Sequence, residues 1–207
     1  MEKFITPVCK TKYLWIFKPN AKFEPCYSIT CIVEDSHEWN GLIGDLTSLY
    51  DAYYDSQCQL TRKKLKKCPY LPWKTDESGL RTFTAKNGVK GTKKDGTTFE
   101  IKIHICGPDR EELKERDLKG MLATGTEAAV GFTANLWAND AQGVGLSARL
   151  NVVQIVKPVY AERFAGYDSM KTFARDDSLF NSRTKVVTDD DNDGLDIHDL
   201  FAGASEG

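Results

Sequence analysis

One stretch of the sequence, residues 37–59, has the pattern of a long amphipathic helix, and this limits the folds open to the chain. Apolar side chains recur there at steps of three and four residues, which places them along one stripe of a helix. These side chains are Trp39, Leu42, Ile43, Leu46, Leu49, Tyr50, Tyr53 and Tyr54. Ser36 stands where a helix cap is expected, and the acids Glu34, Asp35 and Glu38 lie near the positive end of the helix dipole.

Runs typical of β-strands lie on both sides of this helix, with β-branched and aromatic residues and alternating apolar positions. We expect strands at residues 11–18, 26–34, 80–86, 97–106, 126–137 and 143–156. Because these runs do not alternate regularly with helices, the sequence predicts a mainly β fold, a small barrel with one long inserted helix, rather than a βαβ layout. Residues 93–96, Lys-Lys-Asp-Gly, predict a hairpin turn, and residues 107–120 predict a loop with a helical turn.

The last stretch, residues 188–207, is strongly acidic and contains neither lysine nor arginine. Its acids are Asp189, Asp190, Asp191, Asp193, Asp196, Asp199 and Glu206. All 28 basic residues and 23 of the 30 acids lie outside it, so the body has a formal charge of +5 and the tail of −7. Such asymmetry indicates a polyanionic partner for the body. The tail either binds a protein or competes with an anion for the basic surface of the body.

Basic and aromatic residues are interleaved in the loop at 62–74, and a second lysine-rich loop follows at 86–94. Lys and Arg neutralise phosphates and release counterions, and exposed aromatic rings stack on bases at about 1–3 kcal/mol each. Our candidate phosphate contacts are Arg62, Lys63, Lys64, Lys66, Lys67, Lys86, Lys93 and Lys94. Our stacking candidates are Trp73 first, and then Tyr13, Trp15, Tyr70, Phe83 and Trp137. The alternative is that the lysines are solvated surface and the aromatic side chains fill the core.

No pattern for catalysis or metal binding is complete. The sequence lacks GxSxG, HExxH, a Walker-type glycine loop and GxGxxG after a strand. Residues 189–194, Asp-Asp-Asp-Asn-Asp-Gly, match half of an EF-hand loop, but Leu200 stands where a bidentate carboxylate is needed. The six cysteines form no CxxC pair, although Cys58 and Cys68 would be the best start of a zinc site. We expect reduced thiols and no metal or cofactor.

Two further classes of protein are excluded by hydropathy. No stretch approaches the roughly 20 apolar residues that a membrane span needs. The first residues, Met-Glu-Lys-Phe-Ile-Thr-Pro, lack an apolar signal core, so secretion is not expected.

Several ordered pieces of the sequence resemble the single-stranded DNA-binding proteins of short-tailed, T7-like bacteriophages. One strand closes with Phe17-Lys18-Pro19-Asn20, and the next ends in Ile32-Val33-Glu34-Asp35 before the long helix. The basic, proline-containing loop follows, and residues 143–153, Gly-Val-Gly-Leu-Ser-Ala-Arg-Leu-Asn-Val-Val, are similar to the last barrel strand of that family. The resemblance covers about residues 10–158 and the acidic tail.

This resemblance implies an OB-fold, a five-stranded and partly open barrel that binds single strands on one face. It also implies a tail that contacts polymerase and helicase and shields the DNA cleft, and a location in the cytoplasm of the infected host cell. The tail departs from the family pattern, because Phe201 is followed by six further residues rather than ending the chain. Either Leu200 and Phe201 dock from an internal position or the partner differs.

The sequence thus predicts an OB-fold domain at residues 1–158, an extension at 159–187 and a disordered acidic tail at 188–207. The expected function is non-enzymatic, sequence-tolerant binding of single-stranded DNA in phage replication, recombination and repair. A protein-interaction or virion accessory protein, and a metal-dependent nuclease, are the alternatives. The sequence leaves open the preference for DNA over RNA and the formation of a homodimer.

Overall fold

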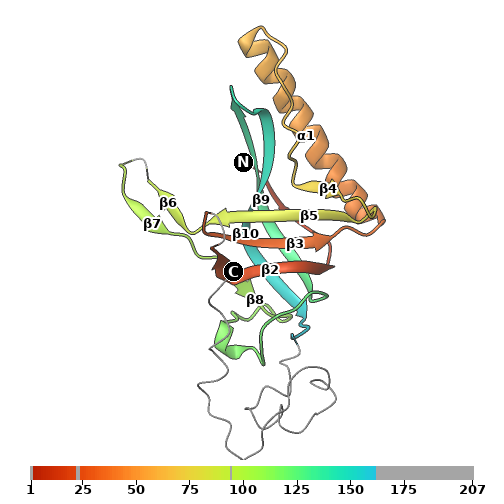
Figure 1. The fold of residues 1–207 in the computed structure, drawn as a ribbon, viewed down its shortest axis with the longest axis vertical. Coiled ribbons are helices and arrows are strands. Elements are labelled where there is room, and N and C mark those ends of the chain that lie inside the picture. The colour runs from red at the N-terminus through yellow and green to blue at the C-terminus, as the bar shows by residue number, and fades with distance from the viewer. Residues whose placement is uncertain (1, 22–23, 94, 162–207) are drawn as a thin grey trace, which may run out of the picture. The chain divides into compact units, whose positions relative to one another are not determined.

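The structure is a computed structural model, and it describes residues 2–161 except residues 22, 23 and 94 (Figure 1). The predictions for most of the extension, for the acidic tail and for Lys94 therefore lie outside the described residues. No helix in the described part of the chain is long and apolar enough to cross a membrane.

Five strands form a closed ring of neighbours in the order β2, β3, β5, β10, β9. Their bounds are β2 Cys9–Asn20, β3 Cys26–Ile32, β5 Arg81–Gly88, β9 Glu127–Asn139 and β10 Gly143–Lys157. All neighbouring pairs are antiparallel except β5 and β10, which run parallel. Two seams are thin, since β10 meets β5 only at Arg149 and Lys86, and β2 meets β9 only at Cys9 and Lys10. The ring fits the five-stranded, partly open barrel that the resemblance implies.

Shorter strands extend this ring. They are β1 Lys3–Ile5 beside β9, β4 Trp73–Thr75 beside β5, and β8 His104–Cys106 beside β10. The remaining pair, β6 Lys90–Thr92 and β7 Thr98–Glu100, forms a separate two-stranded sheet. The hairpin predicted at residues 93–96 is confirmed, because the Gly96 N–H donates to the Lys93 carbonyl at 3.0 Å and Gly96 has a φ of 85°. The predicted helical turn is the 3-10 helix at Glu115–Asp117.

The prediction of one continuous strand at residues 97–106 is wrong. The chain divides there into β7, which pairs with β6, and β8, which pairs in parallel with β10. Between them the Ile101 N–H donates to the Val89 carbonyl at 2.9 Å and closes the base of the hairpin. Alternating apolar residues indicate a β conformation, but they do not indicate which neighbouring strand each part of the segment pairs with.

The predicted helix is confirmed as α1, His37–Thr61. The Ser36 hydroxyl caps it by accepting a hydrogen bond from the Trp39 N–H at 3.2 Å. The stripe buries Trp39, Leu42, Leu46 and Tyr50. Figure 1 shows α1 rising from the end of β3 beside the tips of β9 and β10. The mainly β fold with one long helix is therefore confirmed.

Candidate nucleic-acid interface

A row of outward-facing side chains crosses four strands on the outer face of the ring. Trp15 of β2 lies opposite Ser28 of β3, Ser28 lies opposite Lys86 of β5, and Lys86 pairs with Arg149 of β10. Residues that face each other across neighbouring strands point to the same side of a sheet. Trp15 is 44% exposed, and Lys86 and Arg149 are exposed. The row therefore carries an aromatic ring at one end and two cations at the other.

A second row runs beside the first. Tyr13 lies opposite Thr30, and Thr30 lies opposite Thr84, with the two threonine hydroxyls 3.1 Å apart. Tyr13 is 57% exposed. The intervening positions on β3 and β5, such as Ile29 and Ala85, are fully buried. Strand alternation thus separates an apolar core from an outer face of hydroxyls, aromatic rings and cations.

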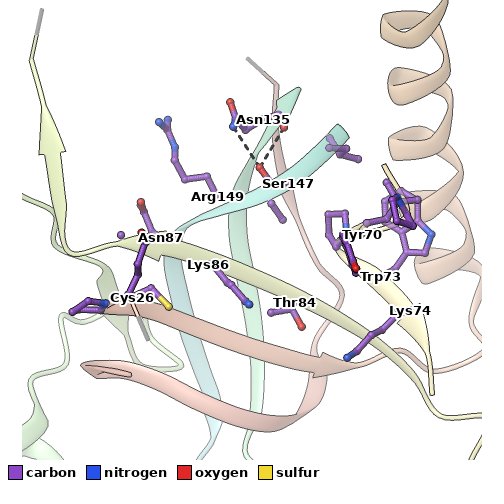
Figure 2. Close-up of a pocket in the computed structure, with 18 residues that line it drawn as sticks. Cys26, Tyr70, Trp73, Lys74, Thr84, Lys86, Asn87, Asn135, Ser147 and Arg149 are labelled. Carbon is purple, nitrogen blue, oxygen red and sulfur yellow. Dashed lines mark hydrogen bonds between the residues drawn. The ribbon is translucent and has the colours of Figure 1, made fainter. Parts of the chain in front are cut away.

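A cleft of about 620 Å³ adjoins these rows and is bounded by β3, β5, β10 and the loop before β4. Its polar, charged and aromatic lining includes Cys26, Tyr70, Trp73, Lys74, Thr84, Lys86, Asn87, Asn135, Ser147 and Arg149. Figure 2 shows Tyr70 and Trp73 at the end near α1, and Asn87 and Cys26 at the opposite end. Within the described residues, no acid forms an ion pair with Lys74, Lys86 or Arg149. The cleft therefore offers three cations to an anionic ligand.

The loop that carries Tyr70 is held at both of its ends. On one side the Val144 N–H donates to the Lys66 carbonyl at 2.9 Å, and the Cys68 N–H donates to the Val144 carbonyl at 2.7 Å. On the other side the Thr84 N–H donates to the Pro72 carbonyl at 2.8 Å. Between these anchors Tyr70 is 79% exposed, so its ring is available to a ligand.

The backbone contact at Lys66 requires a glycine on β10. Gly143 has a φ of 85°, and a Cβ there would lie 2.8 Å from the Lys66 carbonyl carbon. Because a larger side chain would push the loop away, Gly143 fixes the path by which the chain reaches Tyr70.

Trp73 has a different environment from Tyr70. It is half-buried, lies opposite Phe83 across the β4–β5 pair, and packs against the core. Trp73 lines the cleft with part of its surface only. Tyr70, which we ranked below Trp73 from the sequence, is the more accessible of the two rings.

The cations at 62–67 lie outside the lining of the cleft. Lys67 is bound instead within the protein: its Nζ lies 2.6 Å from Asp51 Oδ1 and 4.8 Å from the centre of the Tyr54 ring. The hydrogen bond to Asp51 raises the pKa of Lys67. Arg62 ends the helix with a φ of 54°, while Lys63, Lys64 and Lys66 are exposed on the surface. The structure does not bring these five residues together with Lys86.

Four of the six aromatic candidates lie outside the cleft lining: Tyr13 and Trp15, which stand in the two rows beside it, and Phe83 and Trp137. Phe83 is 0% exposed, with its ring centre 4.9 Å from that of Phe132 and 5.8 Å from that of Trp39. A side chain in this position fills the core and is not accessible to a base, so the structure does not support stacking by Phe83. Trp137 is half-buried and its ring lies over Gly145, where a Cβ would approach the indole Cε2 to 2.5 Å.

Sequence reasoning missed two cations of the cleft, Lys74 and Arg149. Arg149 is the one charged residue between positions 143 and 156, a stretch that otherwise reads as a buried strand. A single charged residue in such a strand indicates a side chain that points out of the core, and this signal could have identified Arg149 as a surface cation. Lys74 directly follows Trp73, but the denser group of cations at residues 62–67 was chosen in its place. Lys93 lies in the turn of the β6–β7 hairpin.

The cysteines of the described part occur as free thiols rather than as a metal site. No three His, Cys, Asp or Glu side chains within residues 2–161, gaps excepted, are grouped so that they could hold a metal ion. Cys58 accepts a hydrogen bond from the Leu65 N–H at 3.4 Å, and Cys68 is buried. A hydrogen bond with Cys9, together with burial, raises the pKa of the Cys31 thiol.

Comparison with known proteins identifies the fold of this chain. No protein-family model and no curated protein matches the sequence. Among solved structures, the chain is similar to gp2.5, a single-stranded DNA-binding protein encoded by bacteriophage T7, with a TM-score of 0.67 and 13% identity over 90% of this chain and 99% of the other. The single-stranded DNA-binding protein of bacteriophage Enc34 in complex with single-stranded DNA gives a TM-score of 0.55 and 18% identity over 77% and 89%.

A C-terminally truncated form of the Enc34 protein gives a TM-score of 0.54 and 20% identity over 75% and 86% of the two chains. At these identities the likeness is one of fold. The predicted resemblance to the phage single-stranded DNA-binding proteins is confirmed at that level.

Proposed function

We propose that this chain is a non-enzymatic, sequence-tolerant single-stranded DNA-binding protein that acts in phage DNA replication, recombination and repair in the host cytoplasm. The observation that carries the proposal is the outer face of the ring, where Trp15, Lys86 and Arg149 form one row beside a cleft that holds Tyr70. The Enc34 protein, which has this fold, was solved with single-stranded DNA bound.

The proposed mechanism divides affinity between two kinds of contact. Lys74, Lys86 and Arg149 neutralise phosphates and release condensed counterions. Tyr13, Trp15, Tyr70 and the part of Trp73 that lines the cleft stack on bases, and every base offers a π-face, so stacking is tolerant of sequence. The hydroxyls of Thr30 and Thr84, which lie between these contacts, form a hydrogen bond with each other.

The first test is the salt dependence of binding to an oligonucleotide. For single strands, the logarithm of the association constant falls with the logarithm of the salt concentration with a slope of about −0.7 per phosphate contact. The double variant Lys86→Ala/Arg149→Ala is expected to reduce the slope by about 1.4, measured by fluorescence anisotropy at several salt concentrations.

Lys157→Ala is the control for this test, because it removes one positive charge from the far end of β10, where Lys157 lies 4.0 Å from Glu127, outside the cleft. Its slope should equal that of the unmodified protein. Affinity that does not change with salt would contradict the proposed function. An absence of any oligonucleotide binding would favour the alternative, a protein-interaction or virion accessory protein.

We assign residues 1–158 to the DNA-binding domain, 159–187 to an extension and 188–207 to a partner-binding tail. The proposal for the tail rests on its charge. Without DNA, the acids at 189–199 screen the cations of the body, and Leu200 and Phe201 dock onto replication proteins such as polymerase and helicase.

A chain that ends at Val187 is therefore expected to bind single-stranded DNA more tightly than the full chain at low salt, measured by anisotropy titration. The difference should disappear near 1 M salt, where the screening length falls to about 3 Å. The full-length variant Leu200→Ala/Phe201→Ala keeps every acid and should bind DNA like the unmodified chain. Equal affinity of the full and shortened chains at low salt would leave the tail with its partner role alone.

A further inference from the structure

The β6–β7 hairpin adds no side chain to the core of the protein. It is a two-stranded sheet of its own, and Lys90, Thr92, Thr98 and Glu100 are all exposed. A hairpin without a covered face is marginally stable by itself. Packing of the domain core therefore does not account for the presence of this hairpin.

Phe99 is held in a specific position on this hairpin. It lies directly opposite Gly91, and the outer part of its ring covers the glycine, so that a Cβ on Gly91 would lie 2.8 Å from the ring Cε1. The glycine gives the ring room to rest against the backbone. Phe99 remains 45% exposed, so the part of the ring that does not contact Gly91 is open to solvent.

The described charged residues around Phe99 are three lysines and two acids, with Glu100 opposite Lys90 across the hairpin and Asp95 ionised in the turn, so the lysines are in excess. Lys90 and Lys93 are exposed on the hairpin, and Lys102 follows its second strand. Asp95 is engaged in the turn, where it accepts hydrogen bonds from the Thr97 N–H and hydroxyl, and these bonds lower the pKa of Asp95. A ring beside several lysines has the composition of a surface for single-stranded nucleic acid.

The hairpin begins where the cleft ends. Lys86, Asn87 and Gly88 of β5 line the cleft, with Asn87 at the end opposite Tyr70 (Figure 2), and β6 starts two residues after Gly88, at Lys90. The hydrogen bond from Ile101 to Val89 fixes the base of the hairpin at this point. Figure 1 shows β6 and β7 projecting outward from the end of β5. A strand that leaves the cleft past Gly88 therefore meets the hairpin next.

We propose that the β6–β7 hairpin is an arm that extends the binding path beyond the cleft, with Phe99 as a stacking platform and Lys90 and Lys93 as phosphate contacts. This inference rests on the proposed function and adds a second contact region to it. Short oligonucleotides fill the cleft alone, and longer ones also reach the arm. The contribution of the arm to affinity should therefore be measurable only with oligonucleotides long enough to reach it.

The test compares Phe99→Leu with the unmodified protein on oligothymidylates from about 4 to 16 nucleotides, the range of site sizes of single OB-folds. Leucine still covers Gly91 but removes the aromatic face. The longest oligonucleotide is expected to bind at least about fivefold more weakly, the lower limit for one lost stack. The shortest oligonucleotide that binds should be unaffected. Thermal unfolding should be unchanged, because Phe99 packs outside the core.

Tyr70→Ala is the matched variant within the cleft, and it should weaken binding at every length. Gly91→Ala keeps Phe99 but displaces its ring, and it should reproduce the length-dependent loss. If Phe99→Leu has no effect, or weakens short and long oligonucleotides equally, the arm is overturned while the proposed function stands. If the unmodified protein binds none of the oligonucleotides, the proposed function fails and the arm fails with it.

Discussion

Replacing Phe83 by alanine is expected to lower the free energy of unfolding by about 3–5 kcal/mol and to leave the affinity of the folded protein for single-stranded DNA unchanged. Phe83 is fully buried between the rings of Trp39 and Phe132, so the substitution opens a cavity at the centre of the core. Urea denaturation gives the stability, and an oligonucleotide titration at low temperature gives the affinity.

Because small domains have a total stability of about 5–15 kcal/mol, the alanine variant is at risk of unfolding. Phe83→Leu keeps an apolar side chain of similar volume and extends the test to a protein that remains folded. Trp15→Ala is the opposite control, with a small effect on unfolding and a clear loss of binding. A Phe83 variant that keeps its stability but binds DNA more weakly would contradict this prediction and support stacking by Phe83.

The double variant Tyr70→Ala/Trp73→Leu is expected to lose about 2–6 kcal/mol of binding free energy, which is at least about thirtyfold in affinity. Both rings line the cleft, and each stack on a base contributes about 1–3 kcal/mol. Leucine at position 73 retains the packing against the core that the indole now provides. The quench of tryptophan fluorescence on DNA binding should also decrease, with Trp15 supplying the remainder.

Met121→Ala is the control for this variant, because Met121 is an exposed apolar side chain that does not line the cleft. Its affinity should equal that of the unmodified protein. If Tyr70→Ala alone has no effect and Trp73→Leu accounts for the whole loss, the accessible ring is not the one that stacks. Stacking would then be assigned to Trp73 and not to Tyr70.

The elements that the sequence predicted well are those encoded by local periodicity. The apolar stripe from Trp39 to Tyr54 has the period of a helix, and the long runs of β9 and β10 have the residue types and pattern of strands, so all three were identified from local sequence. The division of residues 97–106 was not predictable on these grounds, since it depends on where β6 and β10 offer partners.

The candidate site was predicted in its composition more than in its arrangement. The alternation on β5 already separates Phe83 and Ala85 from Thr84 and Lys86, and the burial of the apolar face follows from it. The internal ion pair of Lys67 does not follow from strand alternation. It depends on Asp51, sixteen residues earlier, and on the tyrosine rings beside Lys67. A dense lysine run indicates a charged surface, but only the tertiary contacts decide which of its charges remain available.

The thin seam between β5 and β10 has a thermodynamic consequence. Its single pair places Lys86 and Arg149 on adjacent strands, and like charges in such positions are destabilising. In the ligand-free protein these two cations therefore repel each other across a seam that the Asn87 side chain bridges by donating to the Leu150 carbonyl at 2.8 Å. A bound phosphate relieves that repulsion, so part of the binding energy is returned as cohesion of the barrel. Binding of an anionic ligand at this seam is therefore expected to raise the stability of the domain.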